Sequence, residues 1–198
     1  RFGDNFLGLT DFHEHEEEVP MDRPLWNKIY LPIVKDAWHD MQKLDQLEKR
    51  IRQMGKDTES ATTSADIRKC ILKKILHLTS ICNHPRSSKD LEQDRKAALT
   101  EFTVASHTHK TRWICEKIAT ILRENERDKI IVFSRSRTFL DILLGLLLRH
   151  PGVGCRIVKI DGGSRKKERV SSLRELDGND AVRIALCTIR TTGVGLNM

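Results

Sequence analysis

Aromatic side chains are scarce in this 198-residue sequence, which contains one Tyr, three Trp and six Phe. So few aromatic rings argue against a stacking platform for single-stranded nucleic acid. No apolar run approaches the ~18 residues of a membrane-spanning helix, so we expect no membrane partner. The five cysteines are an odd number without a CxxC pair, which indicates reduced thiols in a cytosolic or nuclear protein.

The sequence also lacks an initial Met and a signal-peptide pattern, since it begins with RFGDNFLGL and stops at GVGLNM. These ends predict a fragment of a longer protein. The length leaves room for one domain and an appendage, at about 150 residues per domain.

The net charge of +7 is divided unevenly along the chain. Residues 1–66 carry nine Lys or Arg against 14 Asp or Glu, whereas residues 67–198 carry 26 against 14. The basic body that follows the acidic head fits an anionic partner, and nucleic acid is the first candidate. Simple solubility explains the same charge, so the composition alone leaves both interpretations open.

Two long helices are predicted in the first half of the chain. From Pro24, which suits a first helical turn, an apolar stripe runs to Met54, with an interruption expected at Pro32. The stripe fits a coiled-coil seam, a partner-binding helix or, as the favoured interpretation, an internal brace. A second helix is expected from near Asp66 to just before Pro85, because the residue before a proline is pushed out of helical geometry.

Strands and helices alternate in the rest of the chain. The apolar runs KIIVFS, CRIVKI and VRIALCT predict strands at residues 129–134, 155–160 and 182–188. Helical periodicity is found at residues 111–124, 139–149 and 166–176. Nearly all-apolar strands that alternate with helices are typical of a parallel sheet covered on both faces. The predicted fold class is therefore α/β, a partial doubly wound parallel sheet preceded by a mainly helical connector.

Five segments in order carry a family resemblance. KIIVFSRSRTFLDIL (129–143), IDGGSRKKERVSSL (160–173) and RIALCTIRTTGVGLNM (183–198) resemble three successive motifs of the Swi/Snf-type helicase-like ATPases of superfamily two. Upstream, EVPMDRPLWNKIY (18–30) and LTSICNHP (78–85) resemble the exit from the family's first lobe and the helix end before its second lobe. The resemblance implies an acidic connector at residues 1–18, a helical interlobe region at 19–109 and a partial C-terminal RecA-like helicase lobe at 110–198.

Polar residues follow each predicted strand, at Ser134, Asp161 and Thr188. Ligands of open parallel sheets lie beyond the carboxyl ends of the strands, where hydroxyls, guanidinium groups and glycine amides suit phosphate oxygens. The resemblance implies that these loops grip one DNA strand and that the GVGLN loop faces the nucleotide. The residues implied for DNA are Ser134, Arg169, Thr188 and Arg190, and those implied for the nucleotide are Gly193, Gly195 and Asn197. Alternatively, Arg169 is a structural arginine that ties the IDGGS loop down.

The chain departs from the family pattern at two places. Arg135 stands where the family usually has Gln, and Thr191–Gly193 replaces the usual turn of a small residue and two glycines. The run of basic residues at 165–167 fits a solvated helix start, a localisation signal or a DNA contact, and its position after IDGG favours DNA.

The residues that ATP hydrolysis needs are absent from the sequence. No GxxxxGK[ST] loop occurs, no Asp-Glu pair follows an apolar strand, and the family's C-terminal arginine motif is expected beyond Met198. We therefore assign no catalytic residue. ATP and magnesium are expected as cofactors of the complete protein, and neither should bind tightly to this chain alone.

Three close pairs could suggest a metal site: His13 with His15, His107 with His109, and Cys82 with His84. Zinc needs about four converging ligands with further support, which these pairs do not offer. We predict no metal site, and we expect Cys82 and His84 to pack a helix end.

The resemblance implies a part of an ATP-dependent motor that moves along double-stranded DNA in chromatin remodelling or DNA repair. Its expected partners are duplex DNA or chromatin and the first RecA-like lobe of the same protein, and its expected location is the nucleus. The alternative is a non-catalytic DNA-binding or scaffold remnant of such a motor. An RNA helicase fits less well, because ICNHP and GVGLN belong to the Swi/Snf pattern.

Overall fold

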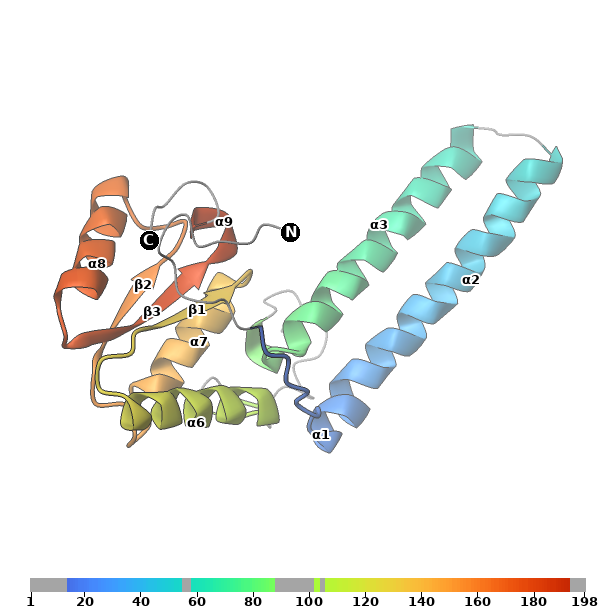
Figure 1. The fold of residues 1–198 in the computed structure, drawn as a ribbon. Helices are drawn as coiled ribbons and strands as arrows, with labels where there is room; N and C mark the ends of the chain where they lie inside the picture. The colour runs from blue at the N-terminus through green and yellow to red at the C-terminus, as the bar shows by residue number, and fades with distance from the viewer. Residues whose placement is uncertain (1–13, 55–57, 88–101, 104–105, 193–198) are drawn as a thin grey trace, which may run out of the picture.

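The structure, a computed structural model, describes residues 14–54, 58–87, 102–103 and 106–192. They form a long helical hairpin and an α/β body that meet at the base of the hairpin (Figure 1). The body contains a parallel sheet, so the predicted α/β fold with a helical segment before it is confirmed. None of the described helices is both long and apolar enough to cross a membrane. The three predicted domain boundaries stay a prediction.

The first arm of the hairpin is one continuous rod whose winding changes next to a proline. It starts as α1 (Arg23–Leu25), with Pro24 in the first turn, widens into the π turn η1 (Trp26–Tyr30) and continues as α2 (Leu31–Met54). Pro32 has no amide hydrogen to donate to the preceding turn, and the wider π turn lies directly before it. The predicted interruption at Pro32 is therefore a change of winding and not a break.

The second arm, α3 (Thr58–Ile81), begins eight residues before the predicted start near Asp66. The prediction was wrong because it weighted the low helix propensity of Ser, Thr and Asp in this segment. In the structure α3 packs along α2 and buries Ser64, and Arg68 Nη2 lies 2.7 Å from Glu48 Oε1 on the opposite arm. Contacts between the two arms therefore override the local preference.

A buried histidine closes the joint after α3, which stops before Pro85 as predicted. The Nδ1 atom of His84 accepts a hydrogen bond from the Arg86 amide (3.1 Å), so its Nε2 donates to the Ser106 carbonyl (3.2 Å). Burial lowers the pKa of His84, which keeps the ring neutral and both bonds in place. His84 thus packs the helix end as expected, whereas Cys82 is exposed.

The body repeats a strand-and-helix pattern after one initial helix. Its elements and the short 3₁₀ turn before them are η2 (Pro85–Ser87), α6 (His109–Glu124), β1 (Ile130–Ser134), α7 (Arg137–Leu147), β2 (Arg156–Ile160), α8 (Lys166–Gly178), β3 (Val182–Thr188) and α9 (Ile189–Thr192). The strands pair in parallel in the order β1-β3-β2. The predicted strands and helices of the body are confirmed to within two residues, but the single turn of α9 was not predicted.

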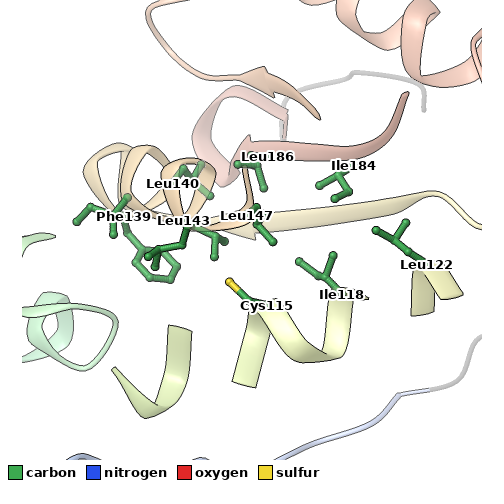
Figure 2. Packing of buried hydrophobic residues seen from close by; sticks show 11 residues of the cluster. Cys115, Ile118, Leu122, Phe139, Leu140, Leu143, Leu147, Ile184 and Leu186 are labelled. Atoms are coloured by element: carbon green, nitrogen blue, oxygen red, sulfur yellow. The ribbon is translucent and has the colours of Figure 1, made fainter. Parts of the chain in front are cut away.

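The middle strand, β3, is buried on both faces. Alternate residues of a strand point to opposite faces. Ile184 and Leu186 therefore meet α6 and α7 (Figure 2), while Ala185 and Cys187 belong to the cluster that includes Leu176 of α8. Burial on both faces explains why VRIALCT is apolar almost throughout. All five cysteines are free thiols.

The sheet is less well covered at β1. Helix α8 contacts β2 and β3, and it leaves Ile131 and Phe133 of β1 36% and 49% exposed. Among the described residues, β1 has a partner strand on one side only. The edge strand is therefore the part of the sheet with the least protection from solvent.

Asp22 joins the hairpin to the body. Its backbone carbonyl accepts a hydrogen bond from the Trp26 amide (2.9 Å), and its Oδ2 accepts one from the amide of His109, the first residue of α6 (2.9 Å). The His109 ring lies beside the same carboxylate, with Nε2 3.1 Å from Oδ1. A few residues earlier, Glu17 Oε1 lies 3.0 Å from Lys117 Nζ of α6. One aspartate thus serves the first turns of two helices.

Candidate nucleic-acid interface

The three strands end side by side at one edge of the sheet. Ser134 is the register partner of Thr188, and Ile160, the last residue of β2, is the partner of Cys187. Asp161 follows Ile160 directly. The loops after β1, β2 and β3 therefore meet, as expected for parallel strands. We call this place the strand-end edge.

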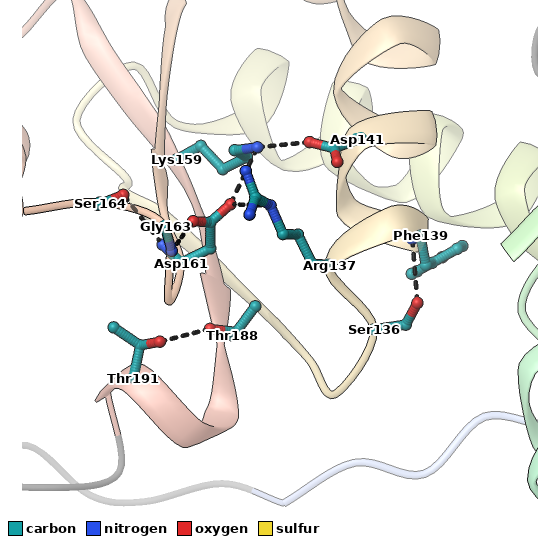
Figure 3. Close-up of polar contacts among 10 residues, drawn as sticks. All are labelled: Ser136, Arg137, Phe139, Asp141, Lys159, Asp161, Gly163, Ser164, Thr188 and Thr191. Atoms are coloured by element: carbon teal, nitrogen blue, oxygen red, sulfur yellow. Dashed lines mark hydrogen bonds and ion pairs between the residues drawn. The ribbon is translucent and has the colours of Figure 1, made fainter. Parts of the chain in front are cut away.

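Ser134 and Thr188 are both buried, and their hydroxyl groups shape the loops that follow them. Ser134 Oγ accepts a hydrogen bond from the Ser136 amide (3.1 Å). Thr188 Oγ1 lies 2.8 Å from Thr191 Oγ1, as Figure 3 shows. The hydroxyl hydrogen of Ser134 has no acceptor among the described residues. It therefore remains available for an oxygen of a ligand.

The two predicted arginines differ in their surroundings. Arg190 lies in α9, is exposed, and makes no hydrogen bond or ion pair within the described part of the chain. Arg169 is half-buried, and its Nε donates to the Ser164 carbonyl (3.1 Å). That bond ties the IDGGS loop to α8, which is the structural role considered as the alternative. The DNA roles of both residues stay predictions.

The structure brings together a charged cluster that the sequence analysis missed (Figure 3). Its centre is Asp161, only 2% exposed, whose Oδ1 accepts a hydrogen bond from the Gly163 amide (2.7 Å). Its Oδ2 lies 3.0 Å from both Arg137 Nε and Lys159 Nζ. Lys159 also contacts the carboxylate of Asp141. The cluster therefore ties together the loops after β1 and β2, on either side of β3.

The charges of this cluster stabilise one another. Burial alone would raise the pKa of Asp161, but the ion pair with Lys159, the hydrogen bond from the Gly163 amide and the positive charge of Arg137 hold it below the ordinary value. For Lys159, burial alone would lower the pKa, and the carboxylates of Asp141 and Asp161 raise it above the ordinary value. Both groups are therefore charged at neutral pH.

Exposed basic side chains follow each of the three strands at the strand-end edge. They come from the loop after β1, the start of α8 and the turn after β3: Arg135, Arg137, Arg165, Lys166, Lys167 and Arg190. One carboxylate oxygen of the nearby Glu168 already has a partner, because its Oε2 accepts a hydrogen bond from the Arg165 amide (2.7 Å). Cations and hydroxyl groups in this arrangement suit a polyanion that is held by its phosphates and not by its sequence.

The described residues contain no group of three or more His, Cys, Asp or Glu that could hold a metal ion. The buried carboxylate of Asp161 already faces two cations and an amide. The residues implied for the nucleotide, Gly193, Gly195 and Asn197, lie outside the described residues, as does His13 of the histidine pairs.

Comparison with known proteins identifies the body first. Residues 109–198 match the sequence profile of the helicase conserved C-terminal domain. The DNA repair protein RAD5 of Kluyveromyces lactis is 30% identical over 122 residues, which cover 60% of this chain and 11% of that protein. The ISWI chromatin-remodeling complex ATPase CHR11 of Arabidopsis thaliana is 27% identical over 170 residues, covering 84% and 15%. The chain thus spans less than a sixth of the length of these relatives.

Two solved structures share the fold. The C-terminal domain of the Sulfolobus solfataricus SWI2/SNF2 ATPase superposes with a TM-score of 0.51 at 17% identity, covering 84% of this chain and 62% of that one. The C-terminal part of the Fun30 ATPase domain superposes with a TM-score of 0.54 at 15% identity. The match covers 93% of this chain and 71% of that one. With the motifs and the curated relatives, these matches confirm the resemblance: the chain is similar to a part of the Swi/Snf-type helicase-like ATPases, and the solved structures show that it shares their C-terminal fold.

Proposed function

We propose that this chain is part of an ATP-dependent translocase that moves along double-stranded DNA in the nucleus, in chromatin remodelling or DNA repair. Residues 110–198 belong to its second RecA-like lobe, residues 19–109 to a helical interlobe region and residues 1–18 to an acidic connector. The observation that carries the proposal is the set of exposed cations in the three segments that follow the strands at the strand-end edge. The curated relatives, a DNA repair protein and a chromatin-remodelling ATPase, support the setting.

In this proposal the strand-end edge grips the phosphates of one DNA strand. Arg190 is the main contact, because it is exposed and has no partner within the described residues, so its whole guanidinium is available to fork onto phosphate oxygens. Ser134 offers a hydroxyl hydrogen at the same edge, and Thr188 and Arg169 hold the adjoining loops in shape. ATP and magnesium belong to the complete protein, with Gly193, Gly195 and Asn197 on the nucleotide side.

The test is Arg190→Ala in the complete protein. It should weaken duplex DNA binding about equally across sequences and flatten the dependence of log affinity on log salt by ~1. Arg127→Ala is the matched control, because Arg127 is exposed before β1, at the opposite end of the sheet. Fluorescence anisotropy at several salt concentrations measures both variants. Equal affinity and slope for the two would contradict the proposal, and DNA binding without DNA-stimulated ATP hydrolysis would favour the scaffold alternative.

A further inference from the structure

Arg137 is held on one side and open on the other. Its Nε lies 3.0 Å from Asp161 Oδ2. Its guanidinium also lies over Gly163, where a Cβ atom would come within 2.8 to 3.1 Å of the Arg137 nitrogen and carbon atoms. The side chain nevertheless remains 60% exposed. The ion pair with Asp161 and the close approach of Gly163 to the guanidinium thus fix the direction in which this side chain points.

The two terminal nitrogens of Arg137 are the part of the side chain that recognises oxyanions. Its Nη1 and Nη2 atoms make no hydrogen bond or ion pair within the described residues, and their N–H groups form the fork that matches two phosphate oxygens. A long side chain that is already held in place loses less conformational entropy on binding than a free one. The Asp161 contact therefore prepares Arg137 for a ligand and does not consume its binding capacity.

The buried carboxylate is suited to this supporting role. Asp161 is almost fully covered: its Oδ1 accepts a hydrogen bond from the Gly163 amide, and its Oδ2 forms ion pairs with Lys159 and Arg137 but has no hydrogen-bond partner among the described residues. It therefore presents no negative charge at the surface that would repel a phosphate. Lys159 also contacts Asp141, so the position of the Asp161 carboxylate does not depend on Arg137 alone.

We propose that Arg137 binds a DNA phosphate through its free guanidinium nitrogens and that Asp161 is the residue that positions it. This inference rests on the proposed function, because it requires DNA at the strand-end edge. The start of α7 and the IDGGS loop then act as one phosphate-binding unit, next to the contact proposed for Arg190.

The experiment measures duplex DNA affinity against salt for variants of the complete protein. Arg137→Ala should lower affinity about tenfold and flatten the salt slope by ~1, as expected for the loss of one phosphate contact. Arg137→Lys keeps the charge without the fork, so the slope should stay and the affinity should recover in part. Asp161→Asn and Gly163→Ala leave the charge of Arg137 but disturb its position, so affinity should fall a few-fold at an unchanged slope.

The melting temperature of each variant separates positioning from folding. Gly163 is exposed, so Gly163→Ala should leave the melting temperature unchanged while it displaces the guanidinium. Wild-type affinity and slope in Arg137→Ala, beside a clear loss in Arg190→Ala, would overturn this inference and leave the proposed function standing. Wild-type binding in both variants would overturn the two together. Wild-type affinity in Gly163→Ala with a loss in Arg137→Ala would remove the positioning role.

Discussion

Asp161→Asn is the substitution whose effect on stability can be worked out most fully. Asparagine keeps the shape of the side chain and an oxygen for the Gly163 amide, but it removes the negative charge from between Arg137 and Lys159. The Arg137 side chain is 60% exposed, so solvent screens that ion pair and its loss costs about 0–1 kcal/mol. Lys159 is less exposed, but it keeps its contact with Asp141. The loss of the Lys159–Asp161 ion pair therefore costs about 1–2 kcal/mol.

The expected loss is therefore about 2 kcal/mol of unfolding free energy, or about 4–8 °C in melting temperature for a chain of this size. The control is Asp180→Asn, because Asp180 is exposed before β3 and has no ion pair among the described residues. Thermal unfolding followed by circular dichroism at pH 7 measures both. A melting temperature of the Asp161 variant within about 1 °C of the control would refute the stabilising role of the cluster.

The pH dependence gives a second check on the same variant. The pKa of Asp161 in the folded state lies below its ordinary value of 3.8, so the stability that its charge contributes is fully present above that value. It is lost as the pH falls through the lower pKa of the folded state. The difference in stability between wild type and Asp161→Asn should therefore be constant near neutral pH and shrink only below about pH 4. A difference that shrinks between pH 7 and pH 5 would point to another group.

Two further predictions concern the chain on its own. It should show no DNA-stimulated ATP hydrolysis, because its sequence has neither a GxxxxGK[ST] loop nor an Asp-Glu pair after a strand; turnover above a buffer blank, in a preparation free of other ATPases, would contradict this. It should also fold marginally, because Ile131 and Phe133 leave β1 partly uncovered. Hydrogen exchange should be faster in β1 than in β3, and equally slow exchange across all three strands would be the contrary result.

The strands and most of the helices could be predicted because their signals are local. β3 is apolar almost throughout because both of its faces are buried, and helix periodicity predicts α6, α7 and α8 to within two residues. The start of α3 was missed because it depends on packing along α2, which the polar letters of that segment do not reveal. Local patterns therefore predict a boundary well only where no distant contact overrides them.

The candidate site was predictable in its location but not in its contacts. Parallel strands bring Ser134, Asp161 and Thr188 to one edge, and that much follows from topology. The Arg137–Asp161 pair joins loops that follow different strands, so no spacing in the sequence indicates it. Lys159 did leave a signal, because a cation inside the apolar strand RIVKI implies a buried countercharge.

The double role of Asp22 has a mechanical consequence. The carboxylate and the backbone carbonyl of Asp22 connect the first turns of α1 and α6. The hairpin should therefore rotate together with the body. The 24 residues of α2 give this arm of the hairpin a length of ~36 Å. A rotation of the body by about 5° would then carry the tip of the hairpin through about 3 Å. A small rotation of the body would thereby displace the tip of the hairpin far enough to break a hydrogen bond there.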